Sequence, residues 1–506
     1  MSNASRARII KKDLMARRLE IIILAAIISL AAAIRIITSD YPMWLDEVAS
    51  FELAGMPIRV LWSSWIIRET NPPLYYTVLH YWLFISHHCE WLMRIPNIVF
   101  SLIGILFAYL TAKAMDGKIV AGMLSAIFIA LSMQDIYYSQ QIRGYMLEHL
   151  FGIIMLYAFV MMAKSRDGNT KISIALMYWY VALYLLSAVG ALYCHTTALL
   201  YVAISAAAGY VLIVLRDPDR NKSLIVWSSV HTVIFLAASW WISISASQVG
   251  TSHNLWWISK PSIGAGLSMM SDAYSPMQHS LFAWCIDAGC VVIIARQLLQ
   301  KPDRYNFILL VMAIGMPAVL FLISQHTPIM VPKTINVGSA PAIILLARAL
   351  SDIKRKWLSS AASIIIVISL TIQTLHWIPR RALERWDWLA HDQLVLGSDA
   401  FVFTDDEGAA IALKLYCEIV AHSSCPLRIR VIADNSHVDD WAVGLSGEPT
   451  ISQDTARRLA GSVKAFSVIR RGVDNPNVIF LSAPGRPKIQ HEVNYGWVTL
   501  SEWRSD

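Results

Sequence analysis

The stretch Ile119-Val-Ala-Gly-Met-Leu-Ser-Ala-Ile-Phe-Ile-Ala-Leu131 runs directly into Ser132-Met-Gln-Asp-Ile-Tyr-Tyr-Ser-Gln-Gln-Ile-Arg-Gly-Tyr145. An apolar run is therefore followed at once by a segment rich in tyrosine, amide and charged side chains. A helix needs about 20 apolar residues to cross the hydrocarbon core of a bilayer. We interpret residues 119–136 as a membrane span and residues 132–145 as a polar loop at one membrane face.

Similar apolar runs recur along the whole chain of 506 residues. Hydrophobic residues make up 56% of it, charged residues only 15%, and the mean hydropathy is +0.51. Soluble domains carry about 25% charged residues, so this composition excludes a soluble, disordered, collagenous or disulfide-stapled protein and predicts a polytopic membrane protein. We predict eleven spans, near residues 20–38, 95–112, 119–136, 145–163, 172–191, 195–215, 223–243, 280–298, 306–324, 334–350 and 358–378.

One further apolar segment, residues 72–86, is short and rich in Tyr, Trp and His. Lys and Arg decide its placement because they concentrate in cytoplasmic loops. If the segment does not span, 21 Lys and Arg residues lie on the cytoplasmic side and only seven on the outer side before the final domain. If it does span, this asymmetry is reversed in every later loop. We therefore interpret residues 72–86 as an interfacial helix at the outer surface.

The predicted organisation has three parts. Residues 1–19 form a basic cytoplasmic N-terminus, and the span after them reads as a retained anchor because no small-residue cleavage site follows. Residues 20–378 form the membrane module, with a long first outer loop at 39–94. Residues 379–506 are then extracytoplasmic. The basic residues occur in small groups between apolar runs, which argues against nucleic-acid binding.

The final 128 residues differ in character, with 14 Lys or Arg and 17 Asp or Glu. Short runs at 400–404, 428–433, 465–469 and 478–481 read as buried strands, and residues 407–420 read as a helix between the first two. Strand, helix and strand predict a small α/β domain. Cys417 and Cys425 could pair in an oxidising compartment, and two free thiols are the alternative.

The first outer loop carries two adjacent carboxylates, Asp46 and Glu47, between apolar residues such as Trp44 and Phe51. We expect the apolar flanks to hold them at the membrane surface, to raise the pKa of a carboxylate there and to suit it to proton abstraction. Neighbours on one helix do not share a face, so the two are expected to have different tasks. The structural alternative is a helix cap with a first-turn carboxylate, which spacing alone favours.

The second outer loop, residues 132–145, places Arg143 beside several tyrosines and amides. An Arg there could bind a phosphate or pair with the carboxylates of the first loop. The structural alternative is an aromatic belt with a snorkelling Arg. It accounts for the tyrosines but leaves the Gln-Gln-Ile-Arg cluster unexplained.

Two other outer segments carry candidates of lower specificity. Lys333 stands just ahead of the tenth span, where snorkelling to the interface is the simpler explanation. The loop at 244–279 contains His253 among several tryptophans. It could shape an acceptor site, although ordinary interfacial aromatics explain any single residue in it.

Four motifs in this order resemble those of the GT-C glycosyltransferases. The closest resemblance is to the bacterial branch related to protein O-mannosyltransferases, lipid A aminoarabinose transferases and lipopolysaccharide galacturonosyltransferases, and it covers roughly residues 15–380. It implies a GT-C module of about eleven transmembrane helices with outer juxtamembrane helices. The motifs are Trp44-Leu-Asp46-Glu47, Asn71-Pro-Pro-Leu-Tyr75, Glu90-Trp-Leu-Met-Arg94-Ile-Pro96 and Tyr138-Ser-Gln-Gln-Ile-Arg143-Gly-Tyr145.

The resemblance implies inverting transfer of a sugar from a polyprenyl phosphate to a hydroxyl of a cell-envelope glycan, lipid or protein, at the outer face of a bacterial inner membrane. Asp46 then corresponds to the general base. Glu47 orients the acceptor or helps Asp46 to hold a divalent cation such as Mg²⁺ or Mn²⁺. Arg143 and Lys333 correspond to ligands of the donor phosphate. The further candidates for orienting substrate are Asn71, Tyr75, Tyr138, Gln141, Tyr145 and His253.

The sequence departs from the family pattern at two places. Relatives often have Glu where Gln141 stands, and Arg-Tyr where Lys333 and Thr334 stand. Gln141 removes one potential metal ligand and leaves cation dependence open. Lys333 remains a point charge for phosphate but lacks the bidentate fork of Arg.

Two other functional classes compete with the transferase. A transporter or flippase of an anionic lipid-linked sugar would also need many spans and basic residues, but such proteins more often have internal repeats and charges at mid-membrane. A scaffold or sensor would leave Asp46, Glu47 and the Arg143 cluster unexplained. The polar clusters at one face favour surface chemistry.

Overall fold

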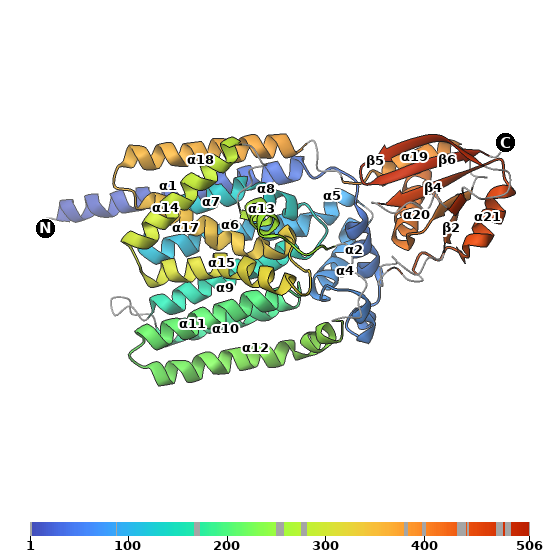
Figure 1. Ribbon diagram of the computed structural model, residues 1–506. Helices are drawn as coiled ribbons and strands as arrows, with labels where there is room; N and C mark the ends of the chain where they lie inside the picture. Colours follow the sequence, from blue (N-terminus) through green and yellow to red (C-terminus); the bar gives the residue numbers. More distant parts are fainter. Residues whose placement is uncertain are drawn as a thin grey trace.

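The computed structural model describes residues 3–87, 89–165, 173–248, 258–274, 281–378, 383–396, 401–432, 442, 445–471, 479–480 and 487–504. It consists of a bundle of long helices, a layer of short helices at one end of that bundle, and a sheet domain beyond the layer (Figure 1). The chain starts at the opposite end of the bundle and ends in the sheet domain. We call the end of the bundle that meets the short helices the domain-facing end.

The bundle helices are long and apolar. Within the described ranges nine helices are suited to crossing a membrane, or ten if the bent pair α7 and α8 forms one span. Each of the eleven predicted spans overlaps a helix of this bundle, although α14, at the predicted span 280–298, is not among the candidates in either count. The chain is a multi-pass membrane protein. The bundle comprises α1 (Asn3–Ile37), α6 (Ile95–Asp116), α7 (Ile119–Leu131), α8 (Met133–Ser139), α9 (Tyr145–Lys164), α10 (Ile174–Leu192), α11 (Ala198–Arg216), α12 (Arg220–Gln248), α14 (Leu281–Gln300), α15 (Arg304–Ser324), α17 (Ser339–Ser351) and α18 (Lys356–Trp377).

The predicted straight span at 119–136 is wrong in its second half. The helix ends at Leu131, and α8 leaves it at an angle of 59°. Ser132 causes the break, because its hydroxyl accepts a hydrogen bond from the amide of Asp135 and caps a new helix. The bend keeps the polar residues after the span buried against the bundle.

The short helices form a layer at the domain-facing end. The predicted interfacial helix at 72–86 is α4, which has 13 residues, is not one of the candidate spans, and packs beside α2 (Figure 1). The prediction that this segment is helical is confirmed, and its place at the outer membrane surface stays a prediction. The short helices are α2 (Leu45–Gly55), α3 (Ile58–Leu61), η1 (Ser64–Arg68), α4 (Leu74–Ser86), α5 (Glu90–Met93), α13 (Ile263–Tyr274), α16 (Pro332–Ile335) and η2 (Asn336–Gly338).

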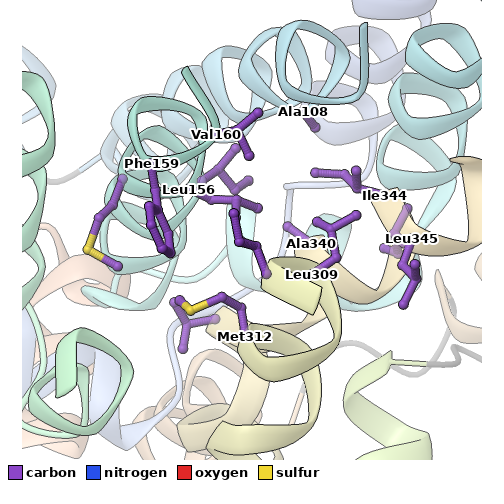
Figure 2. Packing of buried hydrophobic residues seen from close by; sticks show 14 of the residues in the cluster. Ala108, Leu156, Phe159, Val160, Leu309, Met312, Ala340, Ile344 and Leu345 are labelled. Atoms are coloured by element: carbon purple, nitrogen blue, oxygen red, sulfur yellow. The ribbon is translucent and has the colours of Figure 1, made fainter. Parts of the chain in front are cut away.

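The bundle core includes side chains of α6, α9, α15 and α17. Figure 2 shows their side chains meeting: Leu156 and Phe159 from α9, Met312 from α15, and Ile344 from α17. Ala108 of α6 adds a small side chain that lets the helices approach closely. This packing fixes the position of Tyr145, which begins α9. It also fixes the start of α17, which follows Lys333 in the chain.

Ion pairs fasten the same helices at the end of the bundle away from the sheet domain. The buried guanidinium of Arg348 on α17 donates to Asp116 at 2.7 Å and to Asp303 at 2.6 Å. These carboxylates lie at the end of α6 and just before α15, so three helices are tied at one point. Charge-assisted hydrogen bonds to two carboxylates explain how the buried guanidinium of Arg348 is accommodated between these helices.

The C-terminal region folds as the predicted α/β domain. Its six strands have the order β3-β2-β1-β4-β6-β5, with β1 parallel to β2 and β4, and β6 antiparallel to β4 and β5. The helix expected between the first two strands is present as α20. The elements are α19 (Trp386–Leu396), β1 (Phe401–Thr404), α20 (Glu407–Ala421), β2 (Arg428–Ile432), β3 (Thr450–Ile451), α21 (Gln453–Gly461), β4 (Ala465–Arg471), β5 (Lys488–Tyr495) and β6 (Val498–Arg504).

The strand predicted at 478–481 is not found where it can be checked. Residues 478 and 481 lie outside the described residues, and Ile479 and Phe480 belong to no strand. Phe480 instead packs its ring against Phe403 and Phe466 in the core of the domain. An apolar run signals burial here, not sheet pairing.

The alternative left open for the two cysteines is decided. Cys417 of α20 and Cys425, which precedes β2, form a disulfide. The bond closes the connection between a helix and the following strand next to the hydrophobic cluster that α20 shares with α2. Cys417 is fully buried there.

Candidate functional site

Three residues that are far apart in the sequence meet at the domain-facing end. The ammonium group of Lys333 lies 3.4 Å from a carboxylate oxygen of Asp46. The guanidinium of Arg143 donates to the backbone carbonyl of Asp46 at 3.1 Å and to the hydroxyl of Ser50 at 3.2 Å. The three sequence candidates from separate outer segments therefore form one cluster, which we call the cation cluster: Asp46, Arg143 and Lys333.

Asp46 stands at the start of α2, with 28% of its side chain exposed. Burial alone would raise the pKa of this carboxyl, but the positive charges of Lys333, Arg143 and Arg471 outweigh it and lower the pKa below the ordinary value. The expected rise of a carboxylate pKa is therefore wrong for Asp46. Its apolar neighbours in the sequence do not reveal the three cations that the fold brings to it.

Glu47 has different surroundings, as the one-residue offset on a helix predicts. Its side chain is fully buried and forms an ion pair with Arg94 at 3.0 Å. Its second oxygen accepts from the amide of Ile142 at 2.8 Å. Burial raises the pKa of Glu47 more than Arg94 and the amide lower it. Glu47 thus links α2 to α6 and to the second outer loop.

The predicted cation ligands do not fit a divalent metal. Asp46 faces Lys333 and Arg143, while Glu47 is occupied by Arg94 and the Ile142 amide. Among the residues that the structure describes, no group of three or more His, Cys, Asp or Glu side chains could hold a metal ion. The positive charge at this place comes from side chains.

Tyr145 lies under both cations. Its ring centroid is 5.6 Å from the ammonium of Lys333 and 5.8 Å from the guanidinium carbon of Arg143. Tyr138 packs against it edge-on at 5.6 Å. These two predicted tyrosines orient the cations through cation–π contacts and packing.

Gly144 explains why Arg143 can reach this position. A side chain at residue 144 would meet the carbonyl oxygen of Cys194 at 3.0 Å and Tyr75 at 3.2 Å. The loop that carries Arg143 therefore passes closely between α4 and the connection of α10 to α11. Any larger residue would require these neighbours to move by a few tenths of an ångström.

Tyr75 and Gln141 are joined through Asn97, a residue that the sequence did not single out. The Asn97 amide donates to the hydroxyl of Tyr75 at 3.1 Å and to the backbone carbonyl of Arg143 at 2.9 Å, and it also contacts the backbone carbonyl of Gln141. The side chain of Gln141 is buried. These residues hold the loop in place.

Asn71 does not join the cluster. Asn71 donates to Glu69 at 2.6 Å, next to the turn into α4. His253 lies outside the described residues. The sequence identified Asn71 as a candidate because it is polar and lies in a predicted outer loop. That property is shared by residues inside the cluster and residues near it.

His195 is a buried neighbour of Tyr145. Its ring lies 5.5 Å from Tyr145, and its Nδ1 atom is 4.0 Å from the carboxyl of Glu148. Burial, with Lys333 and Arg143 adding to it, lowers the pKa of His195 to about 3. The imidazole is therefore neutral at physiological pH.

The C-terminal domain holds the segment that carries Asp46. Glu384, fully buried, accepts from the amide of Leu45 at 2.8 Å and pairs with Arg471 at 2.7 Å. Tyr416 of α20 accepts from the amide of Met43 at 2.5 Å and contacts Glu90. The domain thus fixes the N-terminal end of α2, and no local sequence pattern reveals this.

Arg94, the ion-pair partner of Glu47, is a second residue near the site that the sequence did not identify as a site residue. It lies in the Glu90-Trp-Leu-Met-Arg94-Ile-Pro96 motif, so the signal was present, but the motif does not say which side chain it serves. Besides Glu47, its guanidinium donates to the carbonyl of Gln140 at 2.7 Å and lies 4.1 Å from the ring centroid of Tyr41. It fastens both outer loops together.

Solved structures share this architecture. ArnT from Cupriavidus metallidurans in the apo state superposes with a TM-score of 0.63 at 11% identity, covering 94% of this chain and 97% of that chain. The same protein bound to undecaprenyl phosphate gives 0.63 at 12% identity and the same coverage. An Archaeoglobus fulgidus oligosaccharyltransferase tethered with an acceptor peptide gives 0.54 at 11% identity, covering 90% of this chain and 69% of that chain.

These similarities lie in structure and not in sequence. No family model matches the sequence, and no curated protein matches it. At 11–12% identity the likeness establishes the fold. The chain has the GT-C fold that its four motifs predicted.

Proposed function

We propose that the chain is an inverting glycosyltransferase that moves a sugar from a polyprenyl phosphate to a hydroxyl of a cell-envelope glycan, lipid or protein. The observation that carries the proposal is the cation cluster, in which a partly exposed carboxylate lies against two cations at one end of a membrane bundle. A phosphate needs the cations, and an acceptor hydroxyl needs the carboxylate. Binding of undecaprenyl phosphate by ArnT, which has the same fold, supports this donor class.

Asp46 is the proposed general base. Its carboxylate accepts the proton of the acceptor hydroxyl while that oxygen bonds to the anomeric carbon from the face opposite the phosphate. The bond from the anomeric carbon to the phosphate oxygen breaks, and the phosphate keeps the electron pair. A positioned base contributes about 10²–10⁴-fold to such a step.

Lys333 and Arg143 are the proposed ligands of the donor phosphate. The phosphate gains negative charge as it leaves, and two preorganised cations stabilise that charge. Lys333 interacts directly with the Asp46 carboxylate before the donor arrives. A bound phosphate competes for this cation, which weakens its hold on Asp46 and makes the carboxylate a stronger base.

Glu47 is proposed as a positioning residue and not as a group that touches substrate. Its ion pair with Arg94 and its bond to the Ile142 amide connect α2 with the loop of Arg143. Tyr75, Tyr138, Gln141 and Tyr145 support the same loop. Asn71 and His253 stay proposals for the edge of the site. No step requires a divalent cation.

The proposed location is a bacterial inner membrane. In this arrangement residues 1–19 are cytoplasmic, residues 20–378 form the catalytic module, and residues 379–506 lie outside with the site. The excess of Lys and Arg in the loops at the other end supports this orientation. The donor and acceptor then meet at the outer surface.

The function is tested with the full chain in lipid nanodiscs. The protein is incubated with a panel of undecaprenyl-phosphate sugars and a mixed cell-envelope acceptor fraction, and release of undecaprenyl phosphate is measured. We expect release with at least one donor, and release slower by about 10²–10⁴-fold from Asp46→Asn. No release with any donor, together with movement of the intact donor between leaflets, would favour the transporter or flippase instead.

A further inference from the structure

The first turn of α9 carries a polar face directly below the cation cluster. Tyr145, Glu148 and His149 have the i, i+3, i+4 spacing that places them on one side of a helix. Tyr145 contacts Lys333 and Arg143. Glu148 and His149 are one turn deeper, and each is at most 2% exposed.

Several polar atoms at this face are buried without a hydrogen-bond partner. They include Oε1 of Glu148, Oδ1 of Asn336 and Nε2 of His149, which has a carboxylate oxygen of Asp135 at 3.5 Å but no hydrogen bond. Asn336 follows Lys333 by three residues, and its amide lies 3.3 Å from Nδ1 of His149. Buried polar atoms are nearly always paired in folded proteins. Three unpaired atoms from two neighbouring elements indicate a place where a polar ligand completes the pairing.

The cation cluster and this polar face are one aromatic ring apart. Tyr145 has the two cations near its ring and His195 at 5.5 Å. The Nδ1 atom of His195 is in turn 4.0 Å from Glu148. The rings of Tyr145 and His195 therefore connect the cation cluster to Glu148.

The charge of the face restricts the ligand. Within the described part of the chain, Glu148 has the neutral imidazole of His195 at 4.0 Å and no Lys or Arg within that distance. Asp135, also buried, lies 3.5 Å from His149. A ligand carboxylate would add negative charge beside two acidic side chains, whereas hydroxyl groups can donate to Glu148 and Asn336 and bond with His149.

We propose that Glu148, His149 and Asn336 form the subsite for the sugar ring of the donor, and that this subsite takes a hydroxyl-bearing ring without an acidic group. The proposal rests on the proposed function, because it assumes that the donor phosphate binds at Lys333 and Arg143. It adds which residues recognise the sugar and which class of sugar is excluded. Tyr145 separates phosphate recognition from sugar recognition.

The test measures the dissociation constants of three lipids for the full chain in nanodiscs by microscale thermophoresis. The lipids are undecaprenyl phosphate, undecaprenyl-phosphate glucose and undecaprenyl-phosphate glucuronate. The variants are Glu148→Ala, His149→Ala and Asn336→Ala, with Lys333→Met as the phosphate-site comparison. Tyr184→Phe is the control. It removes a buried hydroxyl on α10 that bonds to Ser205 on α11, and neither helix carries a subsite residue. Each variant is first checked for a melting temperature within a few degrees of the wild type.

We expect the wild type to bind the glucose lipid at least tenfold more tightly than the glucuronate lipid. Each subsite variant should weaken binding of the glucose lipid by about tenfold and change binding of bare undecaprenyl phosphate by less than twofold. Lys333→Met should weaken all three lipids, and Tyr184→Phe none. The conservative variant Glu148→Gln keeps a hydrogen-bonding side chain, so it should bind the glucose lipid more tightly than Glu148→Ala does. It also replaces Glu148→Ala in the test if that variant does not fold.

Two results would overturn the subsite while leaving the proposed function standing. One is equal binding of glucose and glucuronate lipids by the wild type. The other is a subsite variant that binds the glucose lipid normally or weakens bare undecaprenyl phosphate equally. If the wild type binds no undecaprenyl phosphate at all, the proposed function itself fails, and the subsite fails with it.

Discussion

The Glu47 carboxylate and the Arg94 guanidinium lie 3.0 Å apart, and neither side chain is exposed. This pair turns two neighbouring acidic residues into groups with separate roles. Asp46 points to Lys333 and remains partly open, while Glu47 is enclosed between α2, α6 and the second outer loop. Sequence adjacency therefore does not make them a paired site for a metal ion.

The ion pair should dominate the stability of this region. Glu47→Gln leaves Arg94 buried without its countercharge, and breaking a buried pair costs about 3–5 kcal/mol. We expect a clearly lower melting temperature by intrinsic tryptophan fluorescence. The double variant Glu47→Gln with Arg94→Met should be more stable than Glu47→Gln alone. A double variant no more stable than the single one would contradict the pairing.

Asp46→Asn should remove transfer without unfolding the protein. The amide cannot accept the proton of the acceptor, so we expect a loss of about 10²–10⁴-fold in the rate of undecaprenyl phosphate release. Glu52→Gln, a carboxyl-to-amide change on the same helix, should retain activity. Near-normal release from Asp46→Asn would rule out its role as the base.

Lys333→Met should shift the pH dependence of the reaction. Asp46 must be deprotonated to act, and Lys333 is a main cause of its lowered pKa. Without that charge the pKa of Asp46 rises, so the acidic limb of kcat/KM should move to higher pH. A donor phosphodiester does not titrate in this range, and Lys260→Met, on an exposed outer segment, serves as the control. An unchanged acidic limb would show that Lys333 does not act on the base.

Glu384→Ala should separate the positioning of Asp46 from donor binding. The change removes the acceptor of the Leu45 amide and the partner of Arg471. We expect kcat to fall several-fold, while binding of bare undecaprenyl phosphate changes by less than twofold. The control is Glu492→Ala, which breaks a more exposed ion pair with Arg470 on the sheet. Equal losses in both variants would indicate general damage to the domain.

The proposed orientation predicts which cysteines an impermeant thiol reagent can reach in intact spheroplasts. A cysteine at Ser462, exposed in the C-terminal domain, should be labelled from outside, and one at Lys354, between α17 and α18, should not. The background carries Cys285→Ser because the native thiol is exposed. The reverse labelling pattern would place the site on the cytoplasmic side.

The periodicity and charge of the sequence predicted most of the architecture. Apolar runs of bilayer length located the helices, and the distribution of Lys and Arg placed residues 72–86 outside the set of spans, because these signals are local or additive along the chain. Motifs also identified Asp46 and Arg143 individually, and the family resemblance pointed to Lys333. Each of these can be recognised without knowing its neighbours in space.

The partners of those residues required the tertiary structure. Asp46 and Lys333 are 287 positions apart and meet only because α2 and α16 lie at the same end of the bundle. The direction of the Asp46 pKa shift depends on three cations from three distant segments, and the enclosure of Glu47 depends on Arg94 and a backbone amide. Electrostatic interactions and hydrogen bonds act over a few ångströms in space, so sequence identified the chemical groups and the fold alone decided what each group does.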